Sequence, residues 1–264
     1  MLHVLSNGGC VVTINSHLPL DVCKYVEKYK VQILPVTPSF INLLLISEEY
    51  KNFDLSSLEV VTYGTEVMNK FTLERFCEVF PKIVLKQTYG LSEVGIMSTK
   101  SENSDSLWVK VGGDNFDTRV VDGMLEIKSQ SAMLGYLNAD SPFTEDGWFK
   151  TGDLVEQKGE YIKILGRQSE IINVGGQKVY PLEVENEIIK IDNIEDCLVK
   201  GEKNMLMGQI VVAIVKLVNE EDLVDLKKRI RIALKDKLES YKIPQKVIIQ
   251  KDDLYNQRFK KIRK

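Results

Sequence analysis

The first third of the chain alternates between short apolar runs and segments whose apolar residues recur with helical spacing. Between residues 20 and 29, for example, Val22, Val26 and Tyr29 fall on one face of a helix. Three strands and three helices are predicted in this part: strands over 31–36, 57–64 and 82–90, and helices over 20–29, 39–50 and 69–80. This alternation predicts β-α-β units and a mostly parallel sheet, which would bind a ligand at the carboxyl ends of its strands.

The pattern changes near Trp108, where short strands with alternating polar and apolar residues begin. Residues 109–129 and 161–166 contain such strands, with Gly-Gly and Asp-Gly turns that predict a small antiparallel sheet or barrel. A further unit is predicted from helices over 181–191 and 220–241 and strands over 196–201, 209–218 and 246–250. Between the two, residues 166–169 are short and polar, as hinges tend to be.

The predicted fold class is therefore α/β: a mostly parallel α/β subdomain and a small antiparallel β subdomain, followed by a hinged α+β C-terminal domain. An N-terminal domain is expected over 1–165, made of an α/β subdomain over 1–107 and a β subdomain over 108–165. The hinge at 166–169 leads to an α+β C-terminal domain over 170–264.

Composition and charge argue against several kinds of partner. With 44% apolar and 28% charged residues the chain has the composition of a soluble globular protein, and its net charge of −3 provides no positive field for nucleic acid. No apolar run approaches the roughly 18 residues of a membrane span. The first positive charge is Lys24, which argues against a secretory signal.

The cysteines add no metal site. Cys10, Cys23, Cys77 and Cys197 are widely spaced and the chain has only two histidines, so a zinc site is not expected. We expect reduced core cysteines in a cytoplasmic protein.

Four separated stretches follow the pattern of one enzyme family. They are QTYGLSEVG at 87–95, GWFKTGD at 147–153, GRQSEIINVGGQKVYPLEVE at 166–185, and the tail at 252–264. Each is short, but all four occur in the right order and spacing. The chain resembles the adenylate-forming (AMP-binding) superfamily, which includes acyl-CoA synthetases, luciferases and the adenylation domains of peptide synthetases.

The resemblance implies an acid–thiol ligase of the acyl-CoA synthetase type. In this family a carboxylate attacks the α-phosphate of ATP to give acyl-AMP and pyrophosphate, and the acyl group then passes to a thiol. ATP with Mg²⁺ and coenzyme A are the implied cofactors, and a small carboxylic acid is the implied substrate. Aliphatic, aromatic and amino-acid carboxylates all remain open, and a carrier protein is the alternative to coenzyme A.

A nucleotide site follows from the same resemblance. In the family pattern Tyr89 stacks on adenine, Asp153 accepts both ribose hydroxyls and Arg167 binds ribose or phosphate oxygens. A hydroxyl such as that of Ser92 can bind phosphate, and the carboxylate of Glu93 suits Mg²⁺. The full nucleotide-binding set is Gly64, Thr65, Glu66, Gln87, Thr88, Tyr89, Gly90, Ser92, Asp153 and Arg167. For Gly64–Glu66, which resemble the other adenine wall, a plain turn is the alternative.

The hinge and the thiol site are implied in the third stretch. The family's small domain rotates at the hinge between the two half-reactions, and Ser169 stands where relatives usually carry Asp or Lys. Asn173, Gly175 and Gly176 match the loop that approaches the pantetheine thiol. A Gly-Gly hairpin turn is the alternative for these residues.

The tail carries the implied catalytic lysine. If Leu254 is aligned with the family's leucine, Lys261 falls on the lysine that contacts acyl and phosphate oxygens during adenylation. Tyr255 replaces the usual proline and Lys260 the usual glycine, and a register slip that makes Lys260 the active residue stays open.

One part of the family pattern has no counterpart in the chain. The Ser/Thr/Gly-rich phosphate loop ending in Pro-Lys-Gly does not occur in the sequence. The chain is interpreted as a fragment, as one half of a split enzyme with a complementing N-terminal chain, or as a non-catalytic nucleotide- or partner-binding relative. A homo-oligomer is a further possibility. Residues 36–40 resemble the entry to a substrate-pocket helix, with structural core as the alternative.

Overall fold

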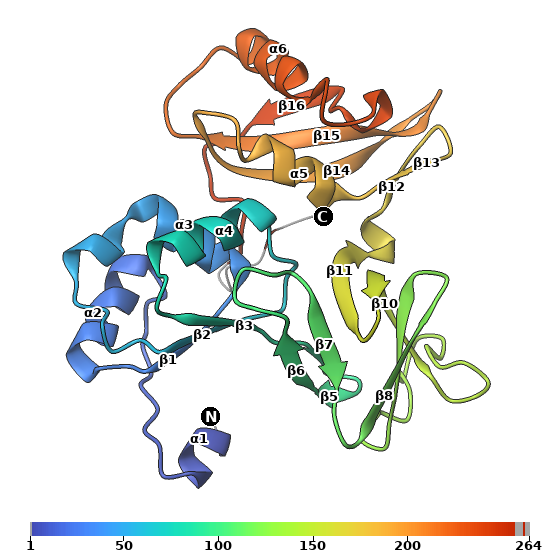
Figure 1. The fold of residues 1–264 in the computed structure, drawn as a ribbon. Helices are drawn as coiled ribbons and strands as arrows, with labels where there is room; N and C mark the ends of the chain where they lie inside the picture. Colours follow the sequence, from blue (N-terminus) through green and yellow to red (C-terminus); the bar gives the residue numbers. More distant parts are fainter. Residues whose placement is uncertain (1, 257–260, 262–264) are drawn as a thin grey trace.

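The structure is a computed structural model that describes residues 2–256 and residue 261. Figure 1 shows three parts: an N-terminal unit of helices on a small sheet, a neighbouring unit of antiparallel strands, and a C-terminal domain lying across both. This confirms the predicted fold class of parallel α/β, antiparallel β and α+β parts.

The N-terminal unit is a parallel sheet with its longer helices packed on one face and the short first helix lying apart from them. Its elements are α1 (Leu2–Ser6), α2 (Pro19–Tyr29), β1 (Ile33–Val36), α3 (Pro38–Ser47), the 3-10 helix η1 (Glu49–Asn52), β2 (Val60–Tyr63), α4 (Lys70–Val79) and β3 (Val84–Gln87). The strands pair in the order β1-β2-β3. Helix α3 begins at Pro38, one residue before the predicted start, because the Thr37 hydroxyl accepts a hydrogen bond from Phe40 N and caps the helix.

The other face of this sheet is open. Val61 and Leu85 point toward the helices and are 2% and 1% exposed, whereas Ile33 and Val84 on the opposite face are 58% and 44% exposed. Figure 1 shows α2, α3 and α4 on the same side of the strands. The open face therefore presents apolar side chains to its surroundings, as surfaces that bind a partner do.

The second unit is a six-stranded antiparallel sheet with a small hairpin beside it. The hairpin is β4 (Gly90–Leu91) and β5 (Gly95–Ile96), and the sheet strands are β6 (Ser98–Ser101), β7 (Val109–Gly112), β8 (Phe116–Val121), β9 (Met124–Ser129), β10 (Phe149–Lys158) and β11 (Tyr161–Arg167). They pair in the order β6-β7-β11-β10-β9-β8. The sheet thus includes β6, which precedes the predicted start near residue 108. The sequence Ser-Thr-Lys-Ser of β6 has no apolar alternation to reveal a strand.

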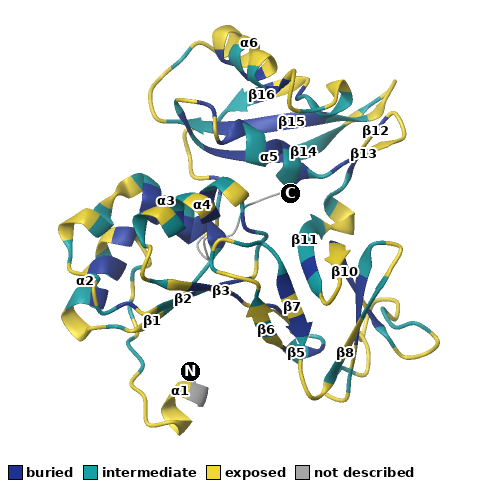
Figure 2. Cartoon of the chain, in the orientation of Figure 1, coloured by how far each residue is buried: buried dark blue, intermediate teal, exposed yellow. Residues whose placement is uncertain are grey.

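The C-terminal domain is an α+β unit with its own core. It contains the 3-10 helix η2 (Gln168–Glu170), β12 (Ile172–Val174), β13 (Gln177–Val179), α5 (Pro181–Ile188), β14 (Ile194–Asn204), β15 (Gly208–Leu217), α6 (Leu223–Leu234), the 3-10 helix η3 (Ser240–Lys242) and β16 (Lys246–Ile249). The sheet order is β13-β12-β15-β14, and β16 pairs in parallel with β15. Val184 of α5 and Leu226 of α6 lie in one buried cluster, and Figure 2 shows the outer face of α6 exposed.

Helix α6 is shorter than the predicted 220–241. It ends at Leu234, and the chain returns through η3. Leu238 and Tyr241 still pack against the core, because the helical period continues through the following turns, whereas Leu223 at the first turn is 44% exposed.

The C-terminal domain contacts the N-terminal unit at the start of α4. The Phe71 side chain packs against the C-terminal core, and Lys70 N donates a hydrogen bond of 3.1 Å to Asn186 Oδ1. These contacts place α5 beside the strand ends of the parallel sheet.

Two whole-chain expectations can be compared with the described residues. Within them, no helix is long and apolar enough to cross a membrane. Cys23 and Cys197 are buried as expected, but Cys10 is exposed and Cys77 is half-buried. Burial raises the pKa of the Cys23 thiol to about 11.

Candidate functional site

A cleft of about 530 Å³ opens where the three parts meet. Its walls come from α3 and the loops after β2 and β3, from the middle of β10 and the end of β11, and from α5 and β14 of the C-terminal domain. Among its lining residues are predicted site residues from every stretch except the thiol loop: Thr65, Glu66, Gln87, Thr88, Tyr89, Gly90, Ser92, Glu93, Asp153, Arg167 and Lys261. The volume lies within the range of small-molecule and cofactor sites.

Tyr89, Asp153 and Arg167 form a connected cluster in this cleft. The Tyr89 hydroxyl donates a hydrogen bond of 2.5 Å to Asp153 Oδ2, and Arg167 Nε lies 2.8 Å from Asp153 Oδ1. Arg167 also donates to the carbonyl of Thr151 at 3.0 Å. Tyr89 lies far from Asp153 and Arg167 in the sequence, so the fold brings these side chains together. Tyr89 follows β3, whereas Asp153 and Arg167 lie on the paired strands β10 and β11.

Burial shifts the ionisation of this cluster. Tyr89 and Asp153 are only 8% and 6% exposed. Desolvation raises the pKa of Asp153, while the Tyr89 hydrogen bond and the Arg167 charge oppose the rise. Desolvation, the Asp153 charge and the hydrogen bond to it raise the pKa of Tyr89 well above its usual range. A carboxylate accepts at about four lone-pair positions, so ionised Asp153 can still accept hydrogen bonds from a ligand's hydroxyl groups.

The loops after β2 and β3 approach each other closely. A Cβ added at Gly64 would lie 2.4 Å from Thr88 Oγ1 and 2.9 Å from Thr88 O, so only glycine fits there. Thr88 N donates to Tyr63 O at 2.7 Å and joins the two loops. Next to Gly64, Thr65 has a φ of 69°. Such a backbone is unusual for a β-branched residue, and backbone strain of this kind gathers at functional sites.

Further residues of the predicted nucleotide set lie around this loop pair. The Gln87 side chain is buried and its oxygen accepts from the Tyr63 hydroxyl at 3.3 Å. Gly90 is packed against the facing strand of the β4–β5 hairpin, where a Cβ would lie 3.1 Å from Gly95 O. Ser92 is exposed at the cleft.

Glu93, the predicted metal ligand, faces the cleft with one partner. Its Oε1 accepts a hydrogen bond of 2.9 Å from the Tyr136 hydroxyl, and this bond to the carboxylate raises the pKa of Tyr136. Among the described residues there is no group of three or more His, Cys, Asp and Glu side chains suited to a metal ion. A lone carboxylate fits Mg²⁺ that is otherwise held by phosphate oxygens and water.

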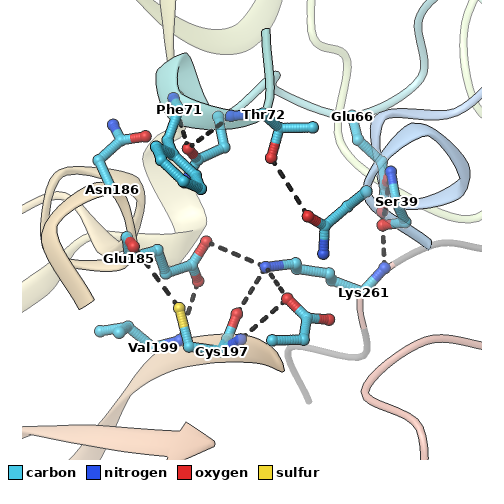
Figure 3. Close-up of polar contacts among 12 residues, drawn as sticks. Ser39, Glu66, Phe71, Thr72, Glu185, Asn186, Cys197, Val199 and Lys261 are labelled. Carbon is cyan, nitrogen blue, oxygen red and sulfur yellow. Dashed lines mark hydrogen bonds and ion pairs between the residues drawn. The ribbon is translucent and has the colours of Figure 1, made fainter. Parts of the chain in front are cut away.

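Lys261 enters the cleft between the two domains (Figure 3). Its backbone N donates a hydrogen bond of 2.6 Å to Glu66 Oε1. Its Nζ donates to Cys197 O at 2.5 Å and lies 3.2 Å from Asp196 Oδ1 and 3.7 Å from Glu185 Oε2. Lys260, the alternative catalytic residue, lies outside the described residues.

The predicted thiol loop lies away from this cleft. Gly175 and Gly176 are the turn of the β12–β13 hairpin, with φ of 57° and 86°, and the Asn173 side chain accepts from Gly176 N at 3.0 Å. These exposed residues do not line the cleft as far as the described chain shows. Ser169 is exposed within η2, directly after β11. The roles of the hairpin and the hinge stay predictions.

Several cleft residues were not predicted from the sequence. Among them, Asn42 comes from α3, and Glu185 and Asp196 come from the C-terminal domain. Residues 36–40 were noted as a substrate-pocket entry, and within that stretch Ser39 lines the cleft while Phe40 is 4% exposed in the core. Glu185 gave one signal that could have been used: it is a charged residue on the inward face of a predicted helix.

Two family models match the chain, one over its N-terminal half and one over its C-terminal domain. The model described as AMP-binding enzyme matches residues 1–137, and the model of the AMP-binding enzyme C-terminal domain matches residues 183–261. The chain belongs to the AMP-binding enzyme family.

Individual relatives agree with this assignment. The chain is 27% identical to indoleacetate–CoA ligase of Aromatoleum aromaticum over 280 residues, covering 98% of the chain and 54% of that enzyme. It is 28% identical to 2,3-dihydroxybenzoate-AMP ligase of Bacillus subtilis over 229 residues, covering 79% of the chain and 42% of that enzyme. The chain thus spans about half the length of the curated relatives it matches.

A solved structure shares the fold. ATP-bound MatB from Rhodopseudomonas palustris superposes with a TM-score of 0.79 at 24% identity, covering 97% of this chain and 55% of that one. At this identity the likeness concerns the fold alone.

Proposed function

We propose that this chain is the nucleotide-binding and mobile-domain part of an enzyme that activates a carboxylate with ATP and transfers the acyl group to a thiol. The observation that carries the proposal is the meeting of Tyr89, Asp153, Arg167 and Lys261 in one cleft. These residues come from separate stretches of sequence, and each had been assigned to the same reaction by its motif. The CoA ligases and the AMP ligase among the relatives support the reaction class.

The chain's own residues suit the nucleoside end of ATP. Buried Asp153, braced by Tyr89 and Arg167, offers a fixed carboxylate for the two ribose hydroxyls. The glycine-dependent approach of the loops at Gly64 and Thr88 forms a narrow wall against which a flat base can lie. Stacking of adenine on Tyr89 would use the ring face that borders the cleft.

The phosphate end of ATP needs positive charge from elsewhere. The described lining contains six carboxylates and two cations: Glu66, Glu93, Asp153, Glu170, Glu185 and Asp196 against Arg167 and Lys261. A free triphosphate would be repelled by this excess of negative charge. Mg²⁺ held by Glu93 and the phosphate oxygens would neutralise part of the charge and stabilise the phosphoryl group during attack.

A further subdomain with a phosphate loop would supply the rest. The open, apolar face of the β1–β3 sheet, with Ile33 and Val84 exposed, supports docking of such a subdomain there. Whether it belongs to the same polypeptide or to a complementing chain is decided by the reading frame upstream of Met1.

Transfer to the thiol is assigned to the β12–β13 hairpin. Its Gly175–Gly176 turn is exposed, and backbone without side chains can border a narrow pantetheine channel. We propose coenzyme A as the acceptor, and rotation at residues 166–169 as the movement that brings the hairpin to the cleft. If the acceptor thiol belongs to a carrier protein, the acyl group would be transferred to that protein and not to free coenzyme A.

The test is ATP–pyrophosphate exchange in the protein completed with a phosphate-loop subdomain, over a broad panel of aliphatic, aromatic and amino-acid carboxylates. We expect exchange that depends on Mg²⁺ and on one class of acid, followed by thioester formation with coenzyme A. Absence of exchange with every acid, together with AMP-dependent stabilisation of the chain, would overturn the enzymatic proposal in favour of a non-catalytic nucleotide-binding protein.

A further inference from the structure

The Glu66 carboxylate joins the two domains at the backbone of Lys261. Glu66 Oε1 accepts from Lys261 N at 2.6 Å, a bond between residues 195 positions apart. Glu66 Oε2 accepts from Ser39 N at 3.2 Å and from Ser39 Oγ at 2.7 Å. One carboxylate oxygen thus bonds to Ser39 within the N-terminal unit, and the other bonds to the tail of the C-terminal domain (Figure 3).

The N-terminal anchor of this carboxylate is rigid. Ser39 is 7% exposed and is the second residue of α3, a helix of ten residues. The helix N-terminus favours a negative charge at this place, because its first N–H groups have no partner within the helix. The Glu66 carboxylate is therefore held by residues of the N-terminal unit that do not depend on the tail.

The tail anchor uses the main chain at Lys261 and leaves its side chain to other partners. The Lys261 ammonium extends to Asp196, Glu185 and the Cys197 carbonyl of the C-terminal domain. The backbone at residue 261 is thus placed by one domain and its ammonium is oriented by the other. A change in either set of contacts would move the ammonium relative to the Tyr89–Asp153–Arg167 cluster.

We infer that Glu66 is a positioning residue: its carboxylate, braced by Ser39, seats the tail of the C-terminal domain and so sets where Lys261 stands in the cleft. The catalytic consequence rests on the proposed function, because Lys261 acts on acyl and phosphate oxygens only if the protein adenylates a carboxylate. The hydrogen bond between Glu66 and the Lys261 amide, called the seat below, is a property of the chain whether or not the chain catalyses the reaction.

The isosteric change Glu66→Gln tests whether the Glu66 carboxylate holds the tail at Lys261. A glutamine has one oxygen and one N–H₂ group, so it cannot accept hydrogen bonds on both sides, and either Ser39 N or Lys261 N loses its acceptor. Hydrogen bonds to charged groups contribute enough that their loss opens the local structure about ten-fold to a hundred-fold more often. Glu59→Gln is the matched control, since Glu59 is an exposed carboxylate of the same unit that accepts from Gln32 Nε2 at 2.9 Å.

The first measurement is the hydrogen-exchange rate of the residue 261 amide in this chain, resolved by NMR. Glu66→Gln is expected to accelerate exchange about ten-fold or more, Ser39→Ala by a smaller factor, and Glu59→Gln not at all. Lys261→Ala should keep the slow amide, because the bond uses the main chain. If Glu66→Gln folds and the exchange rate of the residue 261 amide is unchanged, Glu66 does not hold the tail. If Glu66→Gln does not fold, Ser39→Ala provides the same test.

The second measurement links the seat to chemistry in the completed protein. Glu66→Gln is expected to lower kcat of adenylation about ten-fold with little change in KM for ATP, and to leave thioester formation from preformed acyl-AMP near the wild-type rate. Equal loss in both half-reactions would assign Glu66 a purely structural role and overturn positioning. If the wild-type completed protein fails to adenylate any acid, the proposed function falls, while the exchange rates still decide the seat.

Discussion

Replacing Lys261 with alanine removes an ammonium group from the cleft while leaving the backbone contact to Glu66 intact. The Lys261 side chain is 20% exposed and the Glu185 side chain beside it is 1% exposed, so this charge acts in a partly dry environment. Its loss is expected to impair the step in which negative charge develops on the attacking carboxylate and the α-phosphate.

The size of the effect follows from the distances that this ammonium reaches. It lies 3.2 Å and 3.7 Å from two carboxylates, so contact with a phosphoryl oxygen at a similar separation is attainable. At about 4 Å and an effective dielectric constant of about 20, two unit charges attract by about 4 kcal/mol. Part of this is lost because the ammonium must leave its present acceptors. A net transition-state contribution of about 3 kcal/mol corresponds to a loss of roughly 10²-fold to 10³-fold in adenylation.

The assay compares two half-reactions in the completed protein. Pyrophosphate exchange reports adenylation, and release of thioester from preformed acyl-AMP with coenzyme A reports transfer. Lys261→Ala should lower the first by the stated factor and the second by less than about three-fold. Lys251→Ala is the control, because Lys251 is also near the C-terminus but its side chain is 85% exposed and pairs with the exposed Glu220. Equal losses in both half-reactions, or a loss shared by Lys251→Ala, would refute the assignment.

Three other changes test the nucleoside site, the loop packing and the open sheet face. Burial raises the pKa of Asp153 above its ordinary value of 3.8, and ribose hydroxyls bind the ionised form, so adenosine affinity should be full at neutral pH and fall as the pH drops through the raised pKa. Calorimetric titration at stepped pH measures this, and a profile that stays flat down to pH of about 4 would contradict it. Gly64→Ala should destabilise the chain by about 1–3 kcal/mol in urea unfolding, because its Cβ would meet Thr88, whereas Gly159→Ala, with open space around it, should lose only the backbone strain of its φ of 61°. Val84→Lys should change stability by less than about 0.5 kcal/mol, since Val84 is 44% exposed, yet it should weaken binding of a separately expressed phosphate-loop subdomain; undiminished binding in a pull-down would exclude this face as the docking site.

The pattern of apolar residues predicted where most helices and strands lie better than it predicted where they begin and end. The strands and helices of the N-terminal unit appear where the period of apolar residues changes, because one face of each element is buried. The strand β6 was missed because Ser98–Ser101 pairs through its backbone at the margin of the sheet and buries little apolar surface. The end of α6 was misplaced because Leu238 and Tyr241 continue the apolar period after the helical hydrogen bonds have stopped.

Motif spacing selected side chains that the structure brings together in the cleft, Tyr89, Asp153 and Arg167 among them, but it contained no information about their hydrogen-bond partners. Tyr89, Asp153 and Arg167 each belong to a recognisable stretch, and the structure joins them through direct contacts. The two residues that border the Lys261 ammonium, Glu185 and Asp196, could not be assigned, because their relation to the tail depends on how the C-terminal sheet folds back on itself.

The position of Lys261 shows why the charge run at the tail is a poor guide to function by itself. Five of the last seven residues are Lys or Arg. Such runs of like charge near a terminus are usually solvated, and their number does not distinguish one lysine from another. What distinguishes Lys261 is the pair of constraints at its two ends: a backbone amide bound by Glu66 and an ammonium facing Asp196 and Glu185. Since the first constraint belongs to the N-terminal unit and the second to the C-terminal domain, rotation at residues 166–169 would have to break the first and could keep the second. The lysine would then leave the cleft with its own domain, because the contacts to Asp196 and Glu185 would carry it away once the bond to Glu66 is broken.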